Sequence, residues 1–269
     1  GRPGFKSRLS YVDAEYFNLS EKETRIAKAH RERPSPTLVQ IQHVLHTMPA
    51  GSEVERRNRA LIAFTILTGA RDGAIASLKL KHVDLIESQV FQDAREVKTK
   101  FSKTFTTWFF PVGEETRKIV EEWVRYLREE KLWGHDDPLF PATRVLLGEG
   151  LQFEASGLAC KHWSDAGPIR RIFKETFGVA GLPYFNPHSF RKTLALLGEQ
   201  LCRTPEEFKA WSQNLGHEQV LTTFSSYGKV AAARQAAIIQ GLEQSSASDT
   251  QVLHLAQQLV EAVQRNESS

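Results

Sequence analysis

The spacing of apolar residues changes along this chain, and that change constrains the fold more than any other feature of the sequence. Apolar residues recur at helical intervals from Thr37 to about Pro49 and again through the segment that ends near Arg71. Between Lys79 and Val112 they form short runs rich in alternating, β-branched or aromatic residues. Helical spacing then returns at Glu114 to Glu130. The sequence therefore predicts an α+β fold, predominantly helical, with a small antiparallel sheet of about three strands.

The boundaries of these elements are predicted by residue type. The second helix is expected to end at Thr68-Gly69-Ala70-Arg71, which places Arg71 at a turn. Residues 135 to 167 contain several prolines and glycines, so we interpret them as a long irregular segment before a helix at Pro168 to Phe177. The candidate strands are four runs: Leu80 to Leu85, Gln89 to Phe91, Glu96 to Thr99 and Phe105 to Val112.

The length of 269 residues suits one large domain with short appendages. Residues 1 to 33 are polar and charge-rich, and we interpret them as a linker from a domain that precedes this chain. Residues 34 to 242 are predicted to form the large domain. Residues 243 to 269 are predicted to be a tail, because a serine-rich break precedes an amphipathic helix that begins near Val252.

Composition excludes several classes of protein. The sequence contains no run of about 18 apolar residues, which argues against a membrane-spanning protein. Cys160 and Cys202 have neither a disulfide framework nor zinc-ligand spacing, which indicates a reducing, cytoplasmic setting. His43 and His46 lack a third ligand, and there is no phosphate-binding GxxxxGK[ST] loop, so no metal or cofactor is expected. The pI of about 8.8 suits a polyanionic partner.

Three short segments carry side chains suited to phosphate chemistry. They are Leu67 to Arg71, Pro187 to Arg191, and Leu215-Gly216-His217, which Tyr227 follows ten residues after the histidine. Each has an ordinary interpretation when it stands alone. Arginines and histidines are common on surfaces, a glycine often ends a helix, and a single tyrosine is usually a core aromatic residue.

The order in which these residues occur is more informative than any one of them. An arginine, a lysine in a hairpin, an HxxR motif, an LGH motif and a tyrosine follow one another, and in this the chain resembles the tyrosine site-specific recombinases, also called the phage integrase family. The likeness extends from about Thr37 to Tyr227 and includes the order helix, small sheet, helix. It implies that the large domain is a catalytic domain of that family.

The resemblance implies a role for each matching residue. Arg71 and Arg191 would hold the phosphate, His188 would accompany them, His217 would be the second histidine, and Tyr227 would be the nucleophile. The hairpin lysine is one of Lys98, Lys100 and Lys103. We favour Lys103, because the family places this lysine at a turn some eight residues ahead of a proline that closes the second strand, and Pro111 stands in that relation to it.

The sequence departs from the family pattern at two places. The family usually has an acidic residue three positions after the first arginine, where this chain has Ala74. Asp72 is a candidate substitute. The spacing from His217 to Tyr227 is also one residue longer than in many members, which a mobile helix or loop at the nucleophile would accommodate.

The chemistry that the resemblance implies fits these residue types. Arginine is permanently charged and can donate paired hydrogen bonds to phosphate oxygens, so two arginines can replace a metal ion. Tyr227 would form a 3′-phosphotyrosyl intermediate, and Lys103 would protonate the departing 5′ oxygen. Rejoining would need no ATP, because the covalent link conserves the bond energy. The expected outcome is integration or excision of a mobile element.

The implied partner is double-stranded DNA that carries attachment sites. Its phosphates are expected to contact Lys98, Lys100, Arg170 and Arg171. A homotetramer on DNA is expected, with the C-terminal helix docked on a neighbouring protomer, or else folded back on its own domain. The alternatives are strand relaxation of the type IB topoisomerase kind and a DNA-binding module without catalysis, for which the only residue-level argument is Ala74.

Overall fold

The computed structural model describes residues 34–147 and 153–217 of the chain. The linker predicted for residues 1–33, the tail predicted for residues 243–269 and the predicted nucleophile, Tyr227, lie outside the described residues.

Two capped helices form the centre of the described core. Helix α3, Leu38–Thr47, starts at a capping box made by Thr37 and Gln40. Helix α4, Glu53–Thr68, starts at a second capping box and has an unbroken run of buried residues from Ala60 to Thr68. It ends at Gly69, whose φ of 62° is the left-handed conformation typical of a helix end. The predicted helix boundaries here are confirmed.

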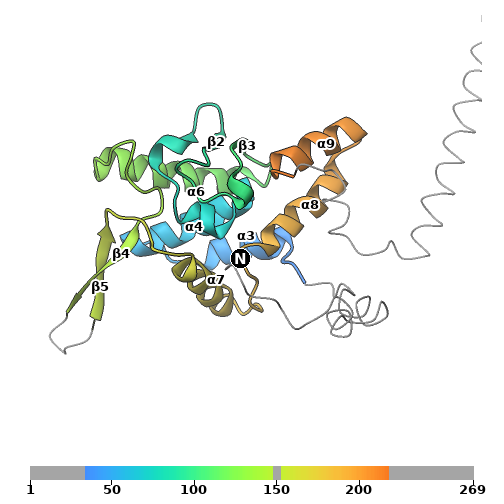
Figure 1. The fold of residues 1–269 in the computed structure, drawn as a ribbon. Coiled ribbons are helices and arrows are strands. Elements are labelled where there is room, and N and C mark those ends of the chain that lie inside the picture. The colour runs from blue at the N-terminus through green and yellow to red at the C-terminus, as the bar shows by residue number, and fades with distance from the viewer. Residues whose placement is uncertain (1–33, 148–152, 218–269) are drawn as a thin grey trace, which may run out of the picture. The chain divides into compact units, whose positions relative to one another are not determined.

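Helix α6, Glu114–Arg125, packs against α4 and continues as a π-helical turn, Tyr126–Glu130 (Figure 1). The sequence predicted this helix, and its apolar face is buried: Ile119, Val120, Trp123, Val124 and Leu127. Burial of one continuous apolar stripe is the main source of stability for an amphipathic helix of this length.

A three-stranded antiparallel sheet lies between α4 and α6 in the chain, as predicted. After a 3₁₀ turn, Leu80–His82, its strands are β1 (Val83–Asp84), β2 (Gln89–Gln92) and β3 (Phe105–Trp108), in the order β1-β2-β3. Val83 faces Val90, which in turn faces Thr107.

One of the four candidate strands was wrong. Glu96 to Thr99 is a turn within the connection between β2 and β3, where the amides of Glu96 and Val97 both donate to the Asp93 carbonyl. These local hydrogen bonds take the place of the inter-strand hydrogen bonds that a strand would need. The run that begins at Phe105 is also shorter than predicted, because β3 ends at Trp108.

The prediction that residues 135 to 167 are irregular was also wrong. Strands β4 (Ala142–Leu147) and β5 (Phe153–Ala159) pair as an antiparallel ribbon, which projects from the helices in Figure 1. The register shifts between Arg144 and Val145, which breaks the two-residue period that identifies strands in a sequence. Val145 and Leu146 are about half exposed, so no buried face imposes an alternating pattern.

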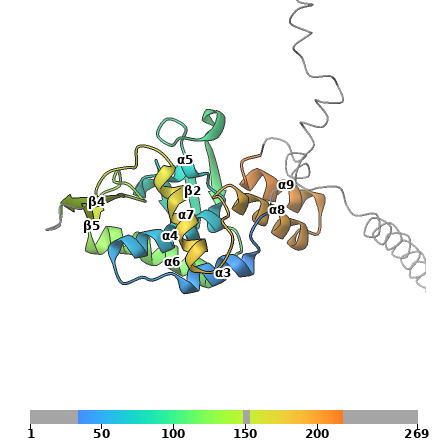
Figure 2. The same cartoon turned by 90° about the horizontal axis from the view of Figure 1, so that it is seen from below.

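Three further helices complete the described part. They are α7 (Gly167–Val179), which was predicted, α8 (Ser189–Leu201) and α9 (Pro205–Asn214). Helices α8 and α9 lie side by side in both Figure 1 and Figure 2. Edge-to-face aromatic contacts of Phe190 with Phe173 and Phe177 join the start of α8 to α7.

Candidate active site

Arg71 lies where the sequence predicted it, at the turn after α4. The left-handed Gly69 ends α4, and Arg71 then occupies the N-cap position of the short helix α5, Asp72–Ile75. The side chain is half-buried, and desolvation lowers the pKa of its guanidinium from the ordinary value. A partly desolvated arginine at a helix start can bind an anion, because both its own charge and the helix N-terminus favour negative groups.

Arg191 is almost completely buried in the first turn of α8, with 6% of its surface exposed. Its Nη1 donates to the Gly69 carbonyl at 2.7 Å, and its Nη2 donates to the Leu215 carbonyl and to Nε2 of His217, the latter at 2.9 Å. Burial and the nearby charge of Arg71 lower its pKa to about 9, so it stays positive at neutral pH. One guanidinium thus joins α8, the end of α4 and the LGH segment.

Gly69 makes this close contact geometrically possible. A Cβ at this position would lie 3.0 Å from side-chain atoms of both Leu194 and Leu215, and its φ of 62° is one that other residues rarely adopt. The glycine of the LTGAR segment therefore lets its own carbonyl meet Arg191 while Leu194 and Leu215 close over it.

His217 follows the end of α9 and faces the two arginines. Because Nε2 accepts a hydrogen bond from Arg191, the ring proton is assigned to Nδ1. Burial, followed by the positive charges of Arg191 and Arg71, lowers the pKa of His217 to about 4. The imidazole is therefore neutral at physiological pH.

His188 is the N-cap residue of α8 and is more exposed than His217. Desolvation is the largest cause of its lowered pKa, and the charges of Arg191 and Arg71 add to it. The structure therefore places His188 within the electrostatic field of the same two arginines. HxxR spacing puts the histidine at the helix entrance and the arginine one turn inside it.

Two of the three candidate lysines approach this group. Lys100 lines a small cavity together with Arg71 and Arg191, and the charge of Lys103 contributes to the low pKa of His217. Lys98 is directed elsewhere, because its Nζ donates to the Ser164 carbonyl at 3.4 Å. The choice of Lys103 over Lys100 stays a prediction.

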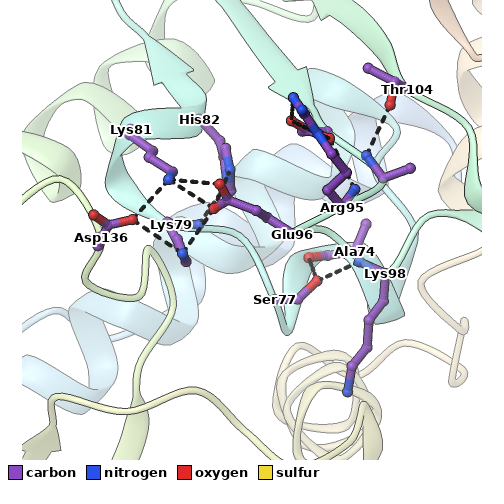
Figure 3. A network of polar contacts seen from close by, with 12 residues as sticks. Ala74, Ser77, Lys79, Lys81, His82, Arg95, Glu96, Lys98, Thr104 and Asp136 are labelled. Atoms are coloured by element: carbon purple, nitrogen blue, oxygen red, sulfur yellow. Dashed lines mark hydrogen bonds and ion pairs between the residues drawn. The ribbon is translucent and has the colours of Figure 1, made fainter.

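The connection between β2 and β3 that carries these lysines is fixed at its base (Figure 3). The Ala94 amide donates to Thr104 Oγ1 at 3.0 Å, and the Lys98 amide donates to Ser77 Oγ at 2.9 Å. Glu96 accepts from the ammonium groups of Lys79 and Lys81 at 2.8 and 2.9 Å. These contacts tie the lysine loop to the segment that follows α5.

Ala74, in place of the family's usual acid, is buried and lines the cavity beneath Arg71. The carboxylate of Asp72 pairs with Nε of Arg170 at 2.7 Å and caps the amide of Gly73. These contacts do not support the substitute role suggested for Asp72, because they lead to α7 and not to the two candidate phosphate-binding arginines.

Of the other predicted DNA contacts, Arg171 is exposed on α7 and Lys100 is exposed on the loop. Sequence reasoning missed the polar residues beneath the site: Gln92, Thr99 and Thr107 line the cavity that Arg71 and Arg191 share. Nothing in the sequence marks them, since polar residues within short strands are ordinary.

The described residues contain neither a metal-ligand cluster nor a membrane-spanning helix. Within residues 34–147 and 153–217, no three His, Cys, Asp or Glu side chains are grouped as metal ligands would be. In the same ranges, no helix is both long and apolar enough to cross a membrane.

Comparison with known proteins gives a match along most of the chain. The family model described as "Phage integrase family" matches residues 37–234. Tyrosine recombinase XerC of Lactobacillus leichmannii is 24% identical over 185 residues, which cover 68% of this chain and 54% of the relative. XerC of Halalkalibacterium halodurans has the same identity and coverage. The chain thus spans about half the length of the curated relatives it matches.

Solved structures show the same fold. A XerA recombinase is similar with a TM-score of 0.55 and 19% identity, over 80% of this chain and 65% of that one. A lambda integrase dimer bound to a COC′ core site is similar with a TM-score of 0.51 and 15% identity, over 78% of this chain and 67% of that one.

Proposed function

The chain belongs to the phage integrase family, and from that premise we propose that it is a site-specific recombinase that cleaves and rejoins DNA through a 3′-phosphotyrosyl intermediate. The observation that carries the proposal is the convergence of Arg71, Arg191 and His217. These residues come from three separate segments of the sequence, yet hydrogen bonds and charge link them at one place. A structural role alone would not explain two arginines held close together when, in the described part of the chain, no carboxylate contributes to the pKa of either one.

The arginines would bind the scissile phosphate and stabilise the charge that develops in the transition state. Within residues 34–147 and 153–217, protein acceptors take three of the five N–H donors of Arg191, and the other two would be directed to the substrate. The half-buried Arg71 can direct its donors to the same phosphate. This preorganisation supplies positive charge through side chains of the chain itself, so we propose that the reaction needs no metal and no other cofactor.

In the remaining steps, one phosphorus–oxygen bond is exchanged for another, and two protons are transferred. The phenol oxygen of Tyr227 attacks phosphorus, and the bond from phosphorus to the 5′ oxygen breaks. The neutral imidazole of His188 is available to accept the phenol proton, because the one acceptor nitrogen of neutral His217 already faces Arg191, and Lys103 donates a proton to the departing 5′ oxygen. Attack by a 5′ hydroxyl on the phosphotyrosine reverses these steps and rejoins DNA.

We propose double-stranded attachment sites in the cytoplasm as the substrate. The similarity to an integrase dimer on a core site and to a XerH recombinase bound to difH substrate supports DNA as the partner. Lys98, Lys100, Arg170 and Arg171 would contact phosphates, so affinity should fall steeply with salt. Arg170 would exchange Asp72 for phosphate on binding.

The assembly would be a homotetramer on two duplexes, with the C-terminal helix docked on a neighbouring protomer. A groove of about 790 Å³ between β3 and the α8–α9 pair, lined by Trp108, Leu201 and Trp211 among others, offers an apolar surface for such a segment. A core-binding domain joined through residues 1–33 would, together with the catalytic domain, form a clamp around DNA. Integration or excision of a mobile element is the role we propose for the reaction.

Strand transfer is tested with nicked suicide duplexes that carry candidate attachment sites, incubated with the full chain in EDTA and resolved on denaturing gels. We expect a covalent protein–DNA adduct with the wild type and none with Tyr227→Phe, although both bind DNA. Adducts that form equally with Tyr227→Phe would contradict the assignment of the nucleophile. Tight binding without any adduct would favour the binding module that Ala74 suggests, and relaxation of supercoils by single protomers would favour the topoisomerase alternative.

A further inference from the structure

The side chain of Asn214 completes the outer edge of the small sheet. Strand β3 is the last strand in the order β1-β2-β3, so the edge that faces away from β2 has no strand partner within the described residues. The Trp108 amide donates to Oδ1 of Asn214 at 2.7 Å, and Nδ2 of Asn214 donates to the Trp108 carbonyl at 2.9 Å. One carboxamide thus satisfies both backbone groups of Trp108, as a neighbouring strand would.

Two further contacts attach the same segment to β3. Thr107 Oγ1 donates to the Asn214 carbonyl at 3.2 Å and itself accepts from Nε2 of Gln92 at 3.3 Å. The ring of Phe105 lies against Gly216, where an added Cβ would be 2.9 Å from ring atoms. The end of α9 is therefore held at three residues of β3, Phe105, Thr107 and Trp108, and Asn214 makes the contacts at the last two.

The segment held in this way leads directly into the candidate active site. Asn214 is followed by Leu215, whose carbonyl accepts from Arg191, and then by Gly216 and His217, whose Nε2 accepts from Arg191. Gly216 has a φ of 71°, so the chain reverses sharply between the attachment point and the histidine. Any shift of the end of α9 relative to β3 would move two of the three acceptors of Arg191, the Leu215 carbonyl and His217 Nε2.

We propose that Asn214 is a positioning residue, which pairs with the edge of β3 and thereby holds His217 and the Leu215 carbonyl against Arg191. The proposal rests on the proposed function for its effect on DNA cleavage, but the geometric part does not depend on it. Asn214 touches neither phosphate nor nucleophile in this scheme. It acts only through the segment that follows it.

The surroundings of His217 supply a signal that reports its position. Among the described residues, the charged and titratable groups that face it include Arg191 and His188 at the start of α8, Arg71 at the turn after α4, and Lys103 in the loop before β3. Burial and these groups lower its pKa to about 4. A histidine released toward solvent would regain a pKa near its ordinary value of about 6.5.

The test compares Asn214→Ala with Gln213→Ala in the full chain. Gln213 is an exposed carboxamide one position earlier on α9, and within the described residues its side chain forms no hydrogen bond with β3, so it controls for loss of an amide from this helix. The pKa of His217 is measured by NMR titration of histidine-labelled protein, with His217→Gln to assign the signal. The rate of covalent adduct formation and the affinity for DNA are measured on the same preparations.

We expect Asn214→Ala to raise the pKa of His217 toward 6.5 and to slow adduct formation by on the order of 10- to 100-fold, with little change in DNA affinity. The slowing should grow as the pH falls below about 6.5, where the released histidine becomes protonated. Gln213→Ala should match the wild type. If Asn214→Ala does not fold, Thr107→Val removes the hydrogen bond to the Asn214 carbonyl and should raise the pKa of His217. Thr107→Ser, which keeps the hydroxyl, should retain the wild-type pKa of His217.

An unchanged His217 pKa and rate in a folded Asn214→Ala would overturn the proposal, as would equal changes in Gln213→Ala. The NMR arm separates this inference from the proposed function. If the wild type forms no adduct on any DNA, the proposed function fails, and the titration still decides whether Asn214 positions His217.

Discussion

The candidate active site has two halves that are built differently. The arginine–histidine half consists of Arg191, Gly69, Leu215 and His217, which are buried or partly buried and joined by short hydrogen bonds. The lysine half is the connection between β2 and β3, whose base is anchored by Glu96 and neighbouring residues but whose tip carries exposed side chains such as Lys100 and Phe101.

This difference indicates that the two halves have different roles in the reaction. Groups that stabilise charge on a phosphate gain most from being fixed in advance, because they then need no rearrangement during the reaction. A proton donor needs to reach the leaving oxygen only when DNA is bound, so a loop can carry it. Substitutions in the first half should therefore change both stability and activity, whereas substitutions in the second should change activity alone.

The largest effect is expected from Arg191→Lys. A lysine cannot reach the Gly69 carbonyl, the Leu215 carbonyl and His217 together, and it would leave buried acceptors without donors. We expect the free energy of unfolding to fall by about 3 kcal/mol and adduct formation to slow by on the order of 10³-fold or more. Urea unfolding and single-turnover cleavage measure the two effects. Arg71→Lys is the matched control, which should lose activity with a stability change of about 1 kcal/mol or less.

Next in size is Lys103→Ala, which should slow cleavage by about 10²- to 10⁴-fold through loss of the general acid and leave the unfolding transition unchanged. A substrate with a 5′-thiol leaving group, which departs without protonation, should recover most of the rate. Lys100→Ala, from the same loop, should show a smaller loss and no such recovery. Thiol rescue of Lys100→Ala instead of Lys103→Ala would reverse the assignment.

A smaller effect is expected from Glu96→Gln. The hydrogen bonds that Glu96 accepts from Lys79 and Lys81 hold its pKa below the ordinary value, so it is charged at neutral pH and fixes the base of the lysine loop. The neutral amide should weaken that anchor and slow cleavage several-fold by misplacing the loop. Glu87→Gln, the same change at an exposed position in the turn between β1 and β2, is the control. A rate for Glu96→Gln equal to that of the wild type would show that the loop is positioned without this anchor.

The last predicted effect concerns stability alone and is a pH dependence in the arginine–histidine half. The pKa of His217 is about 4 when folded, below the ordinary histidine value, so unfolding takes up a proton between these two values. Stability should therefore be complete above about pH 6.5 and decline as the pH falls toward 4. Urea midpoints across this range should decline less for His217→Gln. An equal decline in both proteins would show that His217 is not the group responsible.

The sequence predicted the helices well and the ribbon poorly, for a physical reason. Helices α4 and α6 each bury a long face, and burial imposes a period that can be read directly. Strands β4 and β5 project with little buried surface and contain a register shift, so no period identifies them. Glu96 to Thr99 has the composition of a strand but folds as a turn, because Asp93 provides local acceptors.

Prediction of the candidate site from the sequence was limited in a similar way. Arg71, His188, Arg191 and His217 could be predicted because their order along the chain resembles a family pattern, and the structure brings them to one place. Asn214 could not, since its importance arises from the unpaired edge of β3, which is a tertiary feature. The interaction that fixes a site is often less visible in a sequence than the group that performs its chemistry.

The proposed nucleophile is tested most directly by identifying the residue that becomes linked to DNA. The covalent adduct would be isolated from a suicide duplex in EDTA, digested with protease and nuclease, and analysed by mass spectrometry for a peptide that carries a nucleotide. We expect a 3′-phosphate ester on Tyr227 and a free 5′ hydroxyl on the released strand. A nucleotide on any other residue, or a link through a 5′ phosphate, would contradict this assignment.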